Sequence, residues 1–229
     1  MHQTQREAVA AKFREQAVDS YPNLDAYSFD YGPGHFLVLN NNKGMDLLAP
    51  AFKKWMADDL KGSTDKWKFV CFHIPGFQSS IQHYAEHQIR PLQPLLEECG
   101  VDIAFAGHVH NYQRGVPLKF VPDSDPKKKG SIVDGQFTLD TVFDGVQNTK
   151  PSGVIHIVTG AGGAHLYKPG LEETAPTLRM KYPGSYADFT AKMEVEQHSF
   201  IVLDISPERL QLKCIGVKGD ELDNITITK

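Results

Sequence analysis

The sequence predicts an α/β fold, and two observations carry that prediction. Amphipathic and apolar stretches alternate in the middle of the chain as helix, strand, helix and strand, at residues 50–61, 66–73, 85–99 and 101–107. Both of these strands contain a continuous apolar run, which is typical of strands covered on both faces. We therefore expect a central sheet with other layers packed against it.

The first third of the chain contributes a helix and a hairpin to this scheme. Residues 5–18 have apolar side chains at helical spacing, at Val9, Phe13 and Val18. Residues 26–41 contain two strands joined by a tight turn at Gly32–Gly34.

The two central helices differ in how clearly they are predicted. The helix at 50–61 begins with Pro50, which suits a first turn, and ends at Gly62. The helix at 85–99 contains Pro91 and Pro94, and these prolines favour a start nearer residue 92.

The C-terminal half reads as a loop followed by strands. Residues 115–152 are rich in Gly, Pro, Asp and Lys, and we expect a long variable loop with one short hairpin. Residues 152–167 restore a strand, and residues 198–229 alternate as a β-meander. The 229 residues are expected to form a single domain, 1–229.

Composition narrows the classes of partner. The formal charge of −4 provides no electrostatic reason to expect nucleic-acid binding. Apolar runs stay well below eighteen residues, so no membrane span is expected. The N-terminus lacks the apolar centre of a signal peptide, which leaves a cytoplasmic protein or removal of an earlier part.

Histidines follow both central strands. His73 comes directly after residues 66–72, and His108 and His110 form a Gly-His-x-His unit after residues 101–106. Open α/β sheets place ligand sites at the carboxyl ends of their strands, so His73 and His108 are expected to share a site. Gly107 would let the backbone approach a metal there. His35 and His156 are interpreted as structural, and three other histidines are interpreted as surface or structural residues: His87, His165 and His198.

These residues resemble the calcineurin-like metallophosphoesterases, in particular the purple acid phosphatase-like branch. The resemblance rests on YSFDYGPGHFLVLN, WKFVCFHIP, LLEECGVDIAFAGHVHNYQR, SGVIHIVTGAGGA and HSFIVLDI, and it covers nearly the whole chain. It implies an αββα sandwich with mixed sheets and hydrolysis of phosphate esters at a dinuclear metal centre.

The resemblance also implies roles for individual residues. His73 and His108 would bind the second metal ion, and His110 would bind the first. His83 matches a histidine that contacts the phosphate and assists departure of the leaving group. Tyr112 and Arg114 belong to the same motif, and packing roles are expected for them.

The family's remaining motifs are not found in the sequence. The patterns G-D-x-x-Y and G-N-H-D/E, which supply the bridging aspartate and other ligands, have no counterpart in the expected order. We therefore expect the chain to correspond to the C-terminal part of such an enzyme, without its first strands. A bridging carboxylate holds two cations together, so the chain alone is expected to bind at most one metal ion weakly and to be inactive.

Three functions stay open at this point. The first is a metal-dependent phosphoesterase that uses a metal-activated hydroxide. The second is a catalytically incomplete fragment or degenerate paralogue with a binding or structural role. The third is a mononuclear zinc hydrolase that recruits a carboxylate such as Asp30 or Asp188.

The cofactors and partners follow from the first of these functions. Two metal ions among Fe, Zn and Mn would serve the complete site. The substrate would be a small phosphate ester, with no nucleic acid or membrane involved. Members of this branch are often exported, but the sequence assigns this chain no compartment and no oligomeric state.

Overall fold

The computed structural model describes residues 17–20, 26–42, 46–64, 66–123 and 132–229. Most of the helix expected at 5–18 lies outside these ranges. Its last residues are described and form a strand, so the helix was wrong for Ala17 and Val18.

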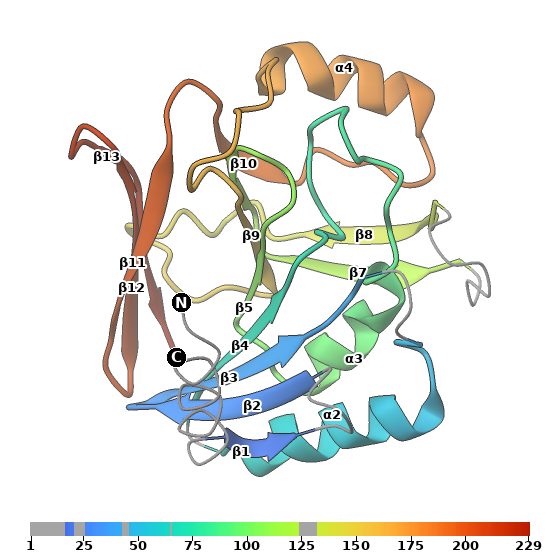
Figure 1. The fold of residues 1–229 in the computed structure, drawn as a ribbon, viewed down its shortest axis with the longest axis vertical. Helices are drawn as coiled ribbons and strands as arrows, with labels where there is room; N and C mark the ends of the chain where they lie inside the picture. The colour runs from blue at the N-terminus through green and yellow to red at the C-terminus, as the bar shows by residue number, and fades with distance from the viewer. Residues whose placement is uncertain (1–16, 21–25, 43–45, 65, 124–131) are drawn as a thin grey trace, which may run out of the picture.

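The largest element is a mixed eight-stranded sheet in the order β1-β2-β3-β4-β5-β9-β6-β10 (Figure 1). Strands β3, β4, β5 and β9 are parallel neighbours, and the others pair antiparallel. Its strands are β1 (Ala17–Ser20), β2 (Ala26–Tyr31), β3 (Gly34–Leu39), β4 (Trp67–Phe72), β5 (Ile103–Ala106), β9 (Ile155–Thr159), β6 (Tyr112–Gly115) and β10 (Thr190–Glu194). The predicted α/β fold with a mixed sheet is thus confirmed.

Two smaller antiparallel sheets accompany it. One consists of β11 (Ser199–Ile205), β12 (Arg209–Gly216) and β13 (Glu221–Thr228), and occupies the segment expected to form a meander. The other is a hairpin of β7 (Leu118–Pro122) and β8 (Gly135–Leu139), within the segment expected to form a loop.

In the described ranges the helices are α2 (Pro50–Gly62), α3 (Gln93–Glu98) and α4 (Leu171–Lys181), with a 3₁₀ turn, η2 (Arg90–Leu92), before α3. Helix α2 agrees with the prediction and buries Phe52, Met56 and Leu60 along one face. The helix expected at 85–99 is shorter than predicted, because Pro91 and Pro94 confine regular structure to residues 90–98. No helix in the described ranges has the length and apolar character needed to cross a membrane.

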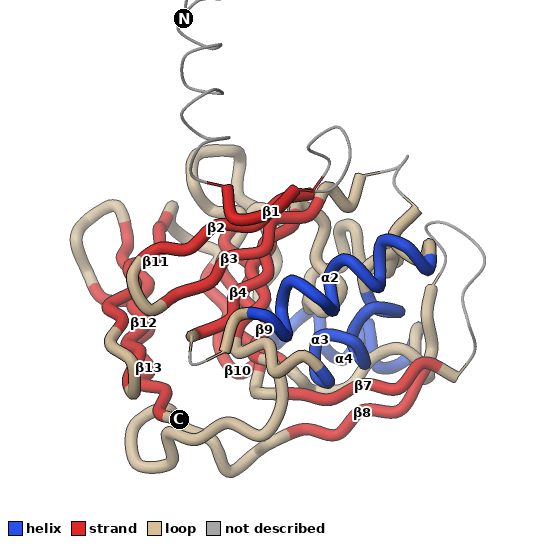
Figure 2. Tube along the Cα trace, turned by 90° about the horizontal axis from the view of Figure 1, so that it is seen from below, coloured by secondary structure: helices blue, strands red, loops and turns tan. Residues whose placement is uncertain are grey.

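The apolar run of strand β4 is continuous because both faces of the strand are buried. Val70 and Phe72 pack with α2 and α3 on one face of the large sheet. Trp67 and Phe69 pack with β12 and β13 on the other face. Figure 2 shows the three layers in this order, so both faces of β4 are covered.

Candidate metal centre

Parallel pairing of β4 and β5 brings His73 and His108 together. Cys71 is paired with Phe105 and Phe72 with Ala106, so both strands end at the same edge of the sheet. His73 and Gly107-His108 follow immediately, and the Gly107 backbone N–H donates to the His73 carbonyl at 3.0 Å. The predicted neighbourhood of these two histidines is therefore present.

Asn41 fixes the loop that carries His73. This buried side chain, just beyond β3, accepts hydrogen bonds from the backbone N–H groups of His73 and Ile74, at 3.0 and 2.9 Å. Its amide nitrogen donates to the Ile74 carbonyl at 2.6 Å. These bonds satisfy the loop's backbone polar groups where the sheet ends.

The imidazoles of His73 and His108 face each other through their nitrogens. His73 Nε2 lies 3.1 Å from His108 Nδ1, and the rings meet edge-on with centroids 4.8 Å apart. Two ligand nitrogens bound to one zinc ion at about 2.0–2.1 Å lie roughly this far apart or slightly farther. The pair therefore offers two nitrogen donors to a single ion.

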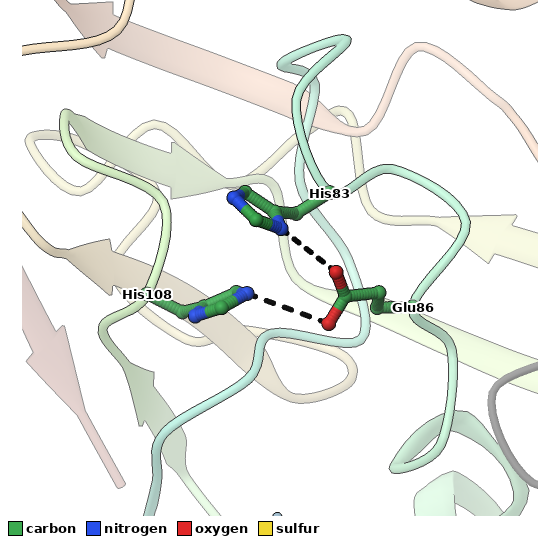
Figure 3. A group of neighbouring side chains, drawn as sticks. All are labelled: His83, Glu86 and His108. Atoms are coloured by element: carbon green, nitrogen blue, oxygen red, sulfur yellow. Dashed lines mark hydrogen bonds and ion pairs between the residues drawn. The ribbon is translucent and has the colours of Figure 1, made fainter.

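His83 and Glu86 complete the cluster, as Figure 3 shows. His83 Nδ1 lies 2.7 Å from Glu86 Oε1, and His108 Nε2 lies 3.4 Å from Glu86 Oε2. The rings of His83 and His108 are 4.1 Å apart. One ligand atom from each of His83, Glu86 and His108 lies within 4.8 Å of the others.

The environment of His108 favours the neutral form of its imidazole. Burial lowers the pKa of His108, and the neighbouring His83 and His73 lower it further, against the opposing effect of Glu86. A neutral imidazole has the lone pair that metal coordination requires. The electrostatics therefore favour a metal-binding form of His108.

His110 lies two residues after His108 on the same loop. Its Nδ1 is 2.9 Å from the His165 carbonyl, which only accepts, so Nδ1 donates and Nε2 keeps its lone pair. Its ring stacks on Tyr167 at 4.3 Å, and the Tyr167 hydroxyl lies 3.3 Å from His83 Nε2. Tyr167 thus connects His110 to the cluster.

The donor set fits one ion better than the family's two. Within the described ranges, Glu86 is the carboxylate that meets these histidines, and each of its oxygens already faces a ring nitrogen. Asp30 lies at the opposite edge of the sheet, near the start of β3, and binds His35 and Lys66. Asp188 pairs with Arg179. Neither of these two aspartates supplies a ligand beside His73.

Sequence reasoning missed Glu86. The usable signal was the spacing His83-x-x-Glu86, because a turn brings residues three apart to the same side. The turn is closed by a hydrogen bond from the Glu86 N–H to the His83 carbonyl at 3.1 Å.

Close backbone approach occurs at Gly160 and not at Gly107. A Cβ on Gly160 would lie 2.1 Å from the Val109 carbonyl oxygen, whereas a Cβ on Gly107 would make an ordinary 3.7 Å contact with the His73 ring. That Gly107 lets the backbone approach a metal ion stays a prediction, because these contacts involve protein atoms only. Gly160, directly after β9, therefore lies against the histidine loop.

An open pocket of about 480 Å³ adjoins this cluster. Gln82, His165, Tyr167 and His198 are among its lining residues, together with Leu166 and Lys168. Gln82 Nε2 donates to the Lys168 carbonyl at 3.1 Å. This hydrogen bond connects the loop that carries His83 to the segment that carries Tyr167 and Lys168.

Comparison with known proteins first shows the class of protein that this chain is similar to. The calcineurin-like phosphoesterase family matches residues 6–112, which include His73, His83, His108 and His110. The resemblance of the chain to this class of metallophosphoesterases is therefore confirmed.

Within that class, the similar proteins are purple acid phosphatases. Purple acid phosphatase 18 of Arabidopsis thaliana is 34% identical over 92 residues, which cover 38% of this chain and 21% of the relative. Purple acid phosphatase 23 of the same plant is 33% identical over 114 residues, or 45% of this chain and 24% of the relative. The chain thus spans about a quarter or less of these relatives.

Solved structures support the fold. A purple acid phosphatase from yellow lupin (Lupinus luteus) seeds superposes with a TM-score of 0.59 at 21% identity, covering 89% of this chain and 32% of that one. GAP50, the anchor in the inner membrane complex of Plasmodium, has a TM-score of 0.51 at 14% identity and covers 91% of this chain and 56% of that one.

Proposed function

We propose that the chain provides the histidine side of a metal-dependent phosphoesterase site of the purple acid phosphatase type. His73 Nε2 and His108 Nδ1 hold one metal ion, His110 Nε2 faces the position of a second ion, and His83 faces the phosphate. The observation that carries this proposal is the 3.1 Å approach of His73 to His108 at the shared carboxyl edge of β4 and β5.

The chemistry divides between the metal and the protein. An ion held by His73 and His108 would supply Lewis acidity and would make a nearby water molecule more acidic, which is the chemistry that phosphate-ester hydrolysis needs. A protonated His83 donates from both ring nitrogens, to Glu86 through Nδ1 and toward a phosphate or leaving-group oxygen through Nε2. The pocket lined by Gln82 and Tyr167 accommodates the alcohol portion of the ester.

The missing carboxylates limit what this chain does by itself. Two cations held about 3.5–4 Å apart need a bridging anion to offset their repulsion. We therefore expect at most one ion per chain by elemental analysis, and no hydrolysis of p-nitrophenyl phosphate. Two tightly held ions per chain would contradict this assignment of the ligands.

Variants test the individual roles. His108→Ala is expected to abolish binding of the single ion, whereas His198→Ala, which changes a pocket histidine outside the cluster, leaves metal content unchanged. In the metal-loaded chain, His83→Ala weakens binding of inorganic phosphate about tenfold or more, measured by calorimetry, because a charge-assisted hydrogen bond is lost. Unchanged metal content in His108→Ala would refute the ligand assignment.

A second function is a binding or structural role without catalysis. The structural likeness to GAP50, the anchor in the inner membrane complex of Plasmodium, supports this function, because one fold can serve several roles. Absence of both metal and phosphate binding in the purified chain would favour that function.

A further inference from the structure

Glu86 is a carboxylate that the sequence motifs leave without a role. It follows His83 by three residues, and its side chain is 27% exposed at the base of the cluster. One oxygen meets a histidine from its own loop, and the other meets a histidine from the loop after β5 (Figure 3). Glu86 therefore contacts a proposed metal ligand and the residue proposed to face the phosphate.

Ionised carboxylates only accept hydrogen bonds, so each ring nitrogen that faces Glu86 carries a hydrogen. This assigns the hydrogen to Nδ1 of His83 and to Nε2 of His108. His108 Nε2 is buried and faces Glu86 Oε2 at 3.4 Å, an ion-pair contact, and no hydrogen bond reaches this nitrogen from the described part of the chain. The lone pair of His108 then lies on Nδ1, the nitrogen 3.1 Å from His73 Nε2.

The backbone of both histidines has a conformation that residues with a Cβ seldom adopt. Among the described residues, the non-glycine residues with positive φ are His83, at 62°, and His108, at 61°. Such conformations are unfavourable for residues with a Cβ and persist where surrounding contacts enforce them. Both of these residues contact Glu86, so the two unfavourable backbone conformations occur at the residues that this carboxylate links.

The His83–Glu86 loop is also anchored at its base. Arg90 is completely buried, and its guanidinium donates to the carbonyls of Gly76 and Ser185, at 2.5 and 2.6 Å. It also lies 4.7 Å over the Phe77 ring. The loop that carries Glu86 is thereby attached to the core at both ends.

We propose that Glu86 is a positioning residue for both histidines, through its two oxygens. It sets the Nε2–H tautomer of His108, which leaves Nδ1 for the metal, and it orients His83 so that Nε2 faces the phosphate. Carboxylates behind metal-binding histidines act in this way, and their loss costs about 10–100-fold in metal affinity. The role of Glu86 in metal and phosphate binding rests on the proposed function, whereas the tautomers of His83 and His108 do not depend on that function.

The test begins with the metal-free chain, by long-range ¹H–¹⁵N NMR of the histidine rings. The wild-type chain is expected to show Nε2–H for His108 and Nδ1–H for His83. In Glu86→Gln the amide can donate to His108 Nε2, so the preference of His108 for Nε2–H is lost. Glu98→Gln, which changes an exposed glutamate paired with Lys61, leaves both tautomers unchanged. Unchanged tautomers in Glu86→Gln would overturn the proposal.

Metal titration completes the test. Glu86→Gln is expected to weaken Zn²⁺ or Co²⁺ binding by about 10–100-fold while the Co²⁺ absorption spectrum keeps its shape, because the ligands are unchanged. A changed spectrum would show that Glu86 is itself a ligand and would overturn the positioning role. If no metal binds but the wild-type tautomers are as stated and shift in Glu86→Gln, the proposed function fails and the positioning of the two histidines by Glu86 stands.

Discussion

At the scale of single residues, the site depends on a glycine outside its own motif. Gly160, just after β9, lies against the backbone of Val109, between the two histidines of the Gly-His-x-His unit. A side chain there would meet a carbonyl oxygen, which has no rotamer by which to move away. Through this contact, the position of β9 determines the position of the loop that carries His108 and His110.

We predict that Gly160→Ala destabilises the chain by about 1–3 kcal/mol, because overpacking forces a backbone shift. Metal affinity should fall with it, since Val109 moves together with His108 and His110. Gly162→Ala is the matched control, because a Cβ at that position meets nothing within 4 Å. Urea unfolding and Zn²⁺ titration of both variants check the prediction, and equal behaviour would contradict it.

At the scale of elements, a buried ion pair joins the two larger sheets. Arg114 of β6 binds Asp223 of β13 with both Nε and Nη2, at 2.6 and 3.1 Å, and the Tyr112 hydroxyl donates to the same carboxylate at 2.7 Å. Burial raises the pKa of Tyr112, and the charge of Asp223 raises it further. These two motif residues thus have the packing role expected for them.

Asp223→Ala is predicted to cost about 3–5 kcal/mol of stability, because it leaves Arg114 buried without a counter-charge. The exposed pair Arg179–Asp188 provides the control, and Asp188→Ala should change stability far less. Equilibrium denaturation measures both, and a similar small loss in the two variants would show that the inter-sheet pair is not a structural contact.

At the scale of the whole molecule, stability depends on pH through a buried histidine. His35 of β3 is 1% exposed and lies between Asp30 of β2 and Asp59 of α2, at 2.9 and 3.0 Å. Burial disfavours the charged ring, but the hydrogen bonds and charges of Asp59 and Asp30 outweigh it and raise the pKa of His35. Lys66 pairs with the other oxygen of Asp30.

Stability from His35 is complete below the unfolded pKa of about 6.5 and is lost as pH rises through the raised folded pKa. We therefore predict that the urea midpoint falls as the pH rises above about 6.5, and that this fall is smaller in His35→Gln. Burial and the charge of Arg90 lower the pKa of His87 to about 2. The same two causes lower the pKa of His156 to about 3. These two residues affect stability below pH 6.5, so they do not obscure the test. Equal slopes in the two proteins above pH 6.5 would contradict it.

Local patterns were sufficient for the elements and for part of the site. The apolar run of β4 and the amphipathic face of α2 predicted a covered sheet, because side-chain periodicity reports which faces are buried. Histidines directly after β4 and β5 predicted a shared edge, since parallel neighbours end together. The same reasoning gave a wrong prediction for Ala17 and Val18, because pairing of their strand with β2 outweighed the helical pattern.

Sequence by itself thus determined the class of fold and the histidine set at one edge of the sheet, because both follow from short-range periodicity and strand order. Tertiary structure alone decided how those histidines are used. Glu86 meets His108 across 21 intervening positions, and Gly160 meets Val109 across 50, so neither contact leaves a local signal. Which nitrogen carries a hydrogen depends on such contacts, and so does the capacity of His73 and His108 to hold an ion.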